Sequence, residues 1–323
     1  MPSNFFAQNA RDIAAGTAIA VVCALISVYF PVPGFICFLL LPLPVLFYRV
    51  KLGRPAAAAI TIAALVLISQ ALDGATADIW MILGMLGLGF GLGDFLERDF
   101  SIEQTIGWAC ILVLTSGLVI LVVLGNLTAG GPWGLMSEYI RRNLEMTAAL
   151  YREIEAPEKN IRLLTESMDQ LHHVLTRIVP ALVAAGLLFA AWMNVLIARA
   201  VLRYNRMPVP EFGILNRWRA PENLVWAVIA CALLIVMPHS LFKFAGLNGL
   251  IVLLPIYLFQ GLAIVSFYFE SKQMPVVLRV LIYVFIAIQQ LLALIVVGLG
   301  FFDTWADFRR LGKNKNGEDK PSQ

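Results

Sequence analysis

The chain has 323 residues, of which 60% are hydrophobic and 14% are charged, and its formal net charge is +3. A soluble domain carries about 25% charged residues, so this composition excludes an ordinary water-soluble protein and predicts a polytopic membrane protein whose surroundings are the lipid bilayer. A net charge this small, without a clustered basic face, excludes nucleic acid as a partner.

Apolar segments recur along the whole chain, and a helix needs about 20 such residues to span a bilayer. Nine segments approach that length: 12–30, 35–49, 55–72, 77–96, 105–127, 178–202, 223–238, 246–269 and 276–301. The segment at 223–238 is the weakest, because it is short and ends at Pro238. We therefore predict an all-α transmembrane helical bundle with eight or nine spans.

Basic residues in the short loops predict the orientation of these spans. The loops that would share one side with the N-terminus carry Arg49, Lys51, Arg54, Arg203, Arg206, Arg217, Arg219, Lys272 and Arg279. The opposite loops "PVPG" and "DGATAD" carry no Lys or Arg. The N-terminus is therefore predicted to be cytoplasmic. Nine crossings would place the basic tail after Arg309 outside, so the choice between eight and nine stays open.

Residues 131–177 form the long polar region of the sequence, between the fifth and sixth segments. Apolar residues recur there at helical spacing on both sides of Pro157, which predicts an amphipathic helical hairpin on the outer face. Its apolar stripe would cap the bundle or lie on the membrane surface; we favour capping, because its acids balance its bases. The predicted divisions are 1–130 and 178–310 for the membrane helices, 131–177 for the insertion and 311–323 for a disordered tail.

The stretch "MILGMLGLGFGLGD" at residues 81–94 resembles a phosphate-binding loop at first sight. The motif G-x-G-x-x-G fails whether it is started at Gly87 or at Gly89, because its sixth position is then Leu92 or Asp94. The stretch also lacks the lysine of a Walker loop and lies within a predicted span, so no nucleotide cofactor is expected. The glycines instead provide the small-xxx-small spacing that lets membrane helices approach closely. Pairs with this spacing are Gly87 with Gly91, Gly89 with Gly93, Ala14 with Ala18, and Gly16 with Ala20. Intramolecular packing and docking of a membrane protein partner both remain open for them.

Residues that carry catalysis or bind metals are sparse. The four cysteines lie in apolar runs without C-x-x-C spacing, and no histidine has a second ligand at i+3 or i+4. Ser116 lacks both the preceding glycine of an intramembrane serine protease and a histidine at membrane depth. We therefore predict no metal site, no cofactor and no enzymatic activity.

Uncharged polar residues inside the spans are predicted to hydrogen-bond between helices; they are Asn194, Gln260, Gln289 and Gln290. A second polar and aromatic group approaches the predicted outer face. Its members are Tyr29, Pro31, Asp73, Trp80, Asn126 and Trp133. These side chains would form an interfacial aromatic belt or border a pocket for a small-molecule ligand.

Four stretches, in this order, carry a family resemblance: "FPVPGFICFLLLPLPVLFYRVKLG", "RWRAPENLVWA", "LFQGLAIVSFYF" and "GLGFFDTWADFRRL". They resemble the landmarks of the YybS-like family of bacterial membrane proteins of unknown function. The resemblance implies a location in the bacterial cytoplasmic membrane.

The first six spans of that family are similar to the S components of energy-coupling-factor transporters. The similarity implies a six-helix bundle that binds a vitamin from outside, with Pro31, Asp73 and Trp133 bordering the pocket. It also implies that Ala14 and Ala18 dock a transmembrane partner. The outer insertion and about three further spans depart from the S-component pattern.

Two functions are therefore expected from the sequence. The first is small-solute binding or transport of the S-component type. The alternative is a structural or regulatory membrane protein that recruits protein partners at the cell envelope through its outer hairpin and its basic cytoplasmic loops.

Overall fold

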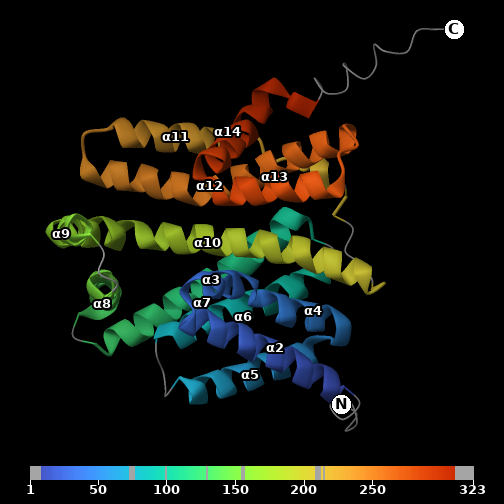
Figure 1. Cartoon of the computed structure of the whole chain (residues 1–323), viewed down its shortest axis with the longest axis horizontal. Helices are drawn as coiled ribbons and strands as arrows, with labels where there is room; N and C mark the ends of the chain where they lie inside the picture. The colour runs from blue at the N-terminus through green and yellow to red at the C-terminus, as the bar shows by residue number, and fades with distance from the viewer. Residues whose placement is uncertain are drawn as a thin grey trace. The chain divides into compact units, whose positions relative to one another are not determined.

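The computed structural model describes residues 9–72, 77–98, 100–128, 130–153, 157–207, 212–213 and 215–309. Helices joined by short turns make up nearly all of these residues, and no strand occurs among them (Figure 1). The chain divides into two compact units. One is Met1–Pro180 with Ala190–Pro210, and the other is Ala181–Phe189 with Glu211–Gln323.

The first unit is built from the helices of the N-terminal half. They are α2 (Ala10–Tyr29), α3 (Pro31–Leu40), α4 (Pro42–Leu52), α5 (Arg54–Ala71), α6 (Ala77–Leu96), α7 (Ile102–Asn126), α8 (Gly131–Glu153), α9 (Glu158–Glu166) and both end portions of α10 (Met168–Tyr204). Helix α4 packs against α2, α5 and α6, and α7 packs against α6 and α8. Local sequence sets several boundaries: prolines start α3 and α4, where a missing N–H costs nothing, and a Ser101–Gln104 capping box starts α7.

The second unit contains α11 (Leu224–Val236), α12 (Ser240–Ser271), α13 (Val276–Ile288) and α14 (Gln290–Ala306), preceded by a short 3₁₀ turn at Leu215–Arg217. Helix α12 packs against α11, α14 and the 3₁₀ turn. The middle portion of α10, Ala181–Phe189, belongs to this unit. There Phe189 lies against Phe259 of α12, with ring centroids 5.5 Å apart.

The prediction of a transmembrane helical bundle is confirmed. Among the residues that the structure describes, the helices long and apolar enough to cross a membrane number seven: Ala10–Tyr29, Val32–Leu52, Arg54–Ala71, Asp78–Leu96, Ile102–Asn126, Met168–Tyr204 and Ser240–Ser271. The predicted segment 223–238 forms only the 13-residue α11, which by itself falls short of the length of a span. The predicted segment 276–301 forms α13 and α14, which are bent by 103° and count at most as one span. The structure thus supports seven or eight spans rather than nine.

The glycine-rich face of α6 is where α4 lies. A Cβ atom at Gly89 would overlap the backbone of Pro42, and a Cβ atom at Gly93 would overlap the side chain of Arg49. At Gly91 a Cβ atom would make only an ordinary contact, 3.7 Å from Cβ of Ala109 in α7, and at Gly87 it would meet nothing within 4 Å. The close approach of α4 therefore requires Gly89 and Gly93, whose spacing permits backbone-level helix packing.

The same end of α6 carries a network of charges around Arg49, which is 1% exposed. Its guanidinium donates to both carboxylate oxygens of Glu97 at 2.5 and 2.7 Å and to Oδ1 of Asp94 at 3.0 Å. Asp94 also accepts from Arg54 Nε at 2.6 Å and from Arg98 Nη2 at 3.1 Å. A buried guanidinium is stable only when it is paired in this way, so the network holds α4 and α5 to the end of α6.

Charged and polar contacts also join the end of α14 to the end of α12 and to the segment before α11. Tyr268 Oη donates to the carbonyl oxygen of Phe308 at 2.7 Å, and Arg309 Nη2 donates to the carbonyl oxygen of Trp218 at 2.8 Å. Asp303, which is fully buried, lies 3.4 Å from Arg309 Nη2. Since α13 starts five residues after α12 ends, the bent pair begins and finishes near the same end of α12. This arrangement favours a re-entrant loop over a broken span.

Two of the predicted interhelical hydrogen bonds can be assessed directly. Asn194 of α10 is fully buried and donates to the carbonyl oxygen of Leu39 in α3 at 2.7 Å, which confirms that prediction. Gln260 of α12 is 2% exposed and accepts from the backbone N–H of Ala220 at 3.3 Å, in the extended segment before α11. Gln289 and Gln290 are exposed instead.

We expect Gly89→Ala to destabilise the protein and Gly87→Ala to leave its stability nearly unchanged. The first substitution forces α4 away from α6, at a cost of about 1–3 kcal/mol, whereas the second adds a methyl group in open space. Thermal unfolding of the two variants, purified in the same detergent, compares them. Equal melting temperatures would show that α4 does not approach α6 so closely.

Arg49→Gln is expected to lower the free energy of unfolding by about 3 kcal/mol, because the carboxylates of Asp94 and Glu97 lose a buried partner. Arg98→Gln removes a half-exposed partner of the same Asp94 and should cost less than about 1 kcal/mol. The ranking is checked by thermal unfolding at low salt, and the opposite order would contradict the network as described.

Fusion reporters test whether the bent pair returns to its starting side. We expect a reporter after Gln323 to lie on the same side of the membrane as one fused after Lys272, because α14 ends beside the end of α12. Paired phosphatase and fluorescent-protein fusions at both positions give the measurement. Opposite readings would mean that α13 and α14 cross the membrane together.

Candidate functional site

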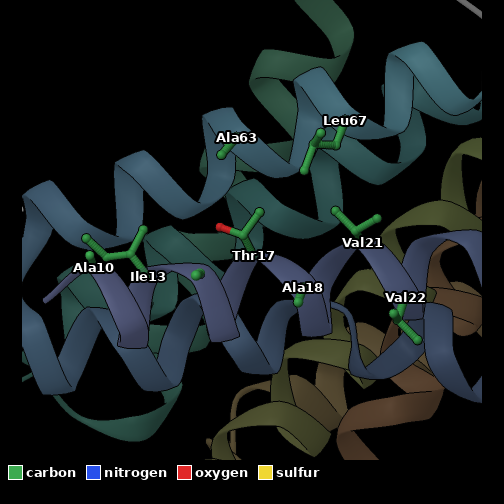
Figure 2. Close-up of a pocket in the computed structure, with 9 residues that line it drawn as sticks. Ala10, Ile13, Thr17, Ala18, Val21, Val22, Ala63 and Leu67 are labelled. Atoms are coloured by element: carbon green, nitrogen blue, oxygen red, sulfur yellow. The ribbon is translucent and has the colours of Figure 1, made fainter.

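An open groove runs along α2 beside α5 and has a volume of about 630 Å³. It is lined by Ala10, Ile13, Ala14, Thr17, Ala18, Val21, Val22, Ala63 and Leu67. Figure 2 shows Ile13, Thr17 and Val21 on α2 near Ala63 and Leu67 of α5. Both helices are candidate spans, so the groove lies at the depth of the lipid.

The lining of the groove is apolar apart from one hydroxyl group. Thr17 is 7% exposed, and its Oγ1 has no hydrogen-bond partner in the described part of the chain. Thr176, by contrast, donates to the carbonyl oxygen of His172 at 2.7 Å, whereas Thr61 and Thr105 lack a partner among the described residues, as Thr17 does. The groove therefore offers shape and apolar contact, with no charged group to bind a polar solute.

Two small-residue pairs of α2 lie in different surroundings. Gly16 and Ala20 are buried, and a Cβ atom at Gly16 would overlap Tyr48 of α4 and Ile60 of α5. Ala14 and Ala18 are exposed and line the groove. The first pair thus packs α2 within its own unit, while the second leaves a surface that no described helix covers.

The predicted outer-face residues lie at the ends of several helices. Tyr29 ends α2, Asn126 ends α7, and Trp80 and Trp133 lie near the starts of α6 and α8; all four are exposed. Pro31 starts α3, and Asp73 lies outside the described residues. None of the described members lines the groove. A small-molecule pocket among them stays a prediction.

Polar contacts hold the predicted outer helices near the starts of the spans. Tyr139 of α8 lies with its hydroxyl 3.7 Å from Sδ of Met81 in α6, and burial together with nearby Asp78 raises the pKa of its phenol. His172 Nε2 lies 3.0 Å from Oγ of Ser137, which joins α10 to α8. The second half of α8 is largely exposed, so whether it caps the bundle or rests on lipid stays open.

Sequence reasoning missed the charge network, although Asp94 lies near the end of the predicted segment 77–96. The signal was present in Arg49, an arginine among apolar residues, which requires a buried acidic partner. That α5 forms the second wall of the groove does not follow from the sequence, because spacing within one helix carries no information about which helix lies beside it. In the described ranges, no group of three His, Cys, Asp or Glu residues has the geometry of a metal site.

Comparison with known proteins agrees with this architecture. Residues 18–304 match the family model described as predicted membrane protein (DUF2232). The chain is also 24% identical over 261 residues to the uncharacterized protein YybS of Bacillus subtilis (strain 168), across 79% of this chain and 82% of that protein. No solved structure gives a significant match. Because the family model covers the helices of both units, the chain belongs to the DUF2232 family of predicted membrane proteins.

Proposed function

We propose that this protein is a non-enzymatic subunit of the bacterial cytoplasmic membrane that docks a transmembrane helix of another membrane protein in the groove beside α2. The observation that carries the proposal is the exposure of Ala14 and Ala18 in an open apolar groove of about 630 Å³. Small side chains at this spacing let a second helix approach to backbone contact.

Elsewhere in the chain, small residues are the places at which one helix packs directly against another, which supports a helix as the occupant of the groove. Gly16 of α2 faces α4 and α5, Gly89 of α6 faces α4, and Gly261 of α12 faces Val296 of α14. In each of these places a helix of the chain lies directly against the small residue. The surface of Ala14 and Ala18 has the same character, and no described helix lies on it.

A polar solute is a poor occupant, because a solute site orients its ligand through a few polar groups. Thr17 supplies the one hydroxyl in this groove, and that oxygen is buried. A lipid acyl chain would meet the same apolar lining, but it gains nothing from regular small-residue spacing. A docked helix does gain, since van der Waals contact is what drives helix association in lipid.

The resemblance of the first six spans to S components supports the same docking face. The resemblance also implies binding or transport of a small solute, for which the groove geometry gives no support. A solute site would lie instead at the helix ends of the predicted outer face, near Tyr29 and Trp80. The alternative function expected from the sequence, recruitment of envelope proteins by the outer hairpin, would use α8 and α9. The groove proposal is independent of both, because its residues lie on α2 and α5.

Filling the groove tests the proposal. We expect Ala14→Leu combined with Ala18→Leu to lower the recovery of a co-purifying membrane protein by about tenfold or more, because the larger side chains occupy the space of the docked helix. Ala15→Leu is the matched control, since Ala15 is exposed on the same helix but outside the groove lining. Recovery is measured by quantitative mass spectrometry after purification in mild detergent.

A photoreactive amino acid at position 14 then identifies the occupant. A protein adduct that forms at position 14 and is absent at position 15 would support helix docking. Lipid adducts alone at position 14 would overturn the proposal, and so would equal recovery of partners from the wild type and both leucine variants.

A further inference from the structure

Two cysteines of the first unit meet across the turn between α2 and α3. Cys23 lies seven residues before Phe30, the residue that separates the two helices, and Cys37 lies seven residues after it. Their thiol groups are hydrogen-bond partners. Seven residues of helix extend about 10 Å, so side chains this far from the turn meet only because α3 folds back along α2. The two thiols therefore belong to neighbouring helices of one hairpin.

A glycine brings the two backbones of this hairpin into contact. A Cβ atom at Gly34 would lie 2.7 Å from the carbonyl oxygen of Ile26 and 3.0 Å from Cα of Ser27. Cys37 follows Gly34 by three residues. Cys23 precedes Ile26 by three, so the thiols lie about one helical turn further along the same contact. A disulfide bond requires Cα atoms within about 7 Å, and backbone contact one turn away favours that separation.

The other two cysteines of the chain fill space between helices instead. Cys110 is buried in α7. Cys231 of α11 lies in the second unit, where its Sγ occupies the space that a Cβ atom at Gly249 of α12 would need. Cys23 and Cys37 are only partly buried, and both are free thiols in this structure. A pair of accessible thiols in contact can be oxidised to a disulfide without a large movement of the helices.

The depth of the pair determines which oxidant can reach it. Helix α2 and the span Val32–Leu52 that contains most of α3 are both candidate spans, and a point about 10 Å from their shared turn lies inside a hydrocarbon core about 30 Å thick. A water-soluble disulfide reacts with a thiolate, and a thiolate is costly where lipid replaces water. A lipid-soluble quinone accepts two protons together with two electrons, so neither its reactants nor its products are charged.

We propose that Cys23 and Cys37 form a redox pair that a membrane quinone oxidises to a disulfide bond between α2 and α3. The Sγ–Sγ bond forms as both S–H bonds break, and the two protons and two electrons pass to the quinone, which becomes a quinol. Neither cysteine lines the groove on α2, so this proposal and helix docking stand or fall independently.

Counting thiols in proteoliposomes tests the proposal. The reduced wild-type protein is incubated with decylubiquinone, quenched in acid, denatured and alkylated with a maleimide, and intact mass spectrometry counts the additions. The chain has four cysteines, so we expect four additions before the quinone and two after it, on a chain of monomer mass. Four additions after the quinone would overturn the proposal. So would a disulfide-linked dimer, or oxidation by oxidised glutathione and not by the quinone.

Single serine substitutions identify the sulfur atoms that react. Cys23→Ser and Cys37→Ser are each expected to keep three additions with or without the quinone, because the remaining thiol has lost its neighbour. Cys231→Ser is the matched control, since Cys231 is also partly buried but lies in the second unit, and its count should fall from three to one. The same fall in Cys23→Ser or Cys37→Ser would mean that another pair is oxidised, which contradicts the proposal.

Discussion

The first unit depends on the close approach of α4 to the glycine face of α6. Gly89 and Gly93 leave space for Pro42 and for the stem of Arg49, and the guanidinium of Arg49 then reaches Asp94 and Glu97. Packing and charge pairing therefore occur at one contact. Helices α2 and α5 pack on α4, and α7 packs on α6, so the remaining helices take their places from this pair.

The second unit also contains a buried arginine, but its pairing is less complete. Arg309 is 6% exposed, and its Nε and Nη1 have no hydrogen-bond partner in the part of the chain that the structure describes. Burial lowers the pKa of its guanidinium, while the nearby carboxylate of Asp303 acts in the opposite direction. A buried cation with unpaired donors is costly, so its contacts to Asp303 and Trp218 fix the end of α14 rather than stabilise the unit strongly.

The long spans were predictable because about 20 apolar residues are a strong physical signal, whereas their interruptions were not. The bend lies at Gln289 and Gln290, and two adjacent glutamines inside a long apolar segment do not by themselves distinguish a break from a continuous helix. The small-residue pairs of α2 illustrate the same limit. Gly16 with Ala20 and Ala14 with Ala18 have identical spacing, yet one pair is buried and the other is open, because the difference lies in the neighbouring helices.

Helix α10 has 37 residues, so it is about 55 Å long and exceeds the hydrocarbon thickness by a wide margin. It follows directly after α9, and its residues are shared between the two units. A continuous helix is stiff along its axis, and Pro180 is the one internal residue that weakens its hydrogen bonding. Helix α10 therefore continues past the hydrocarbon core, and Pro180, whose nitrogen carries no proton for the helical ladder, is the position at which a bend of this helix costs least.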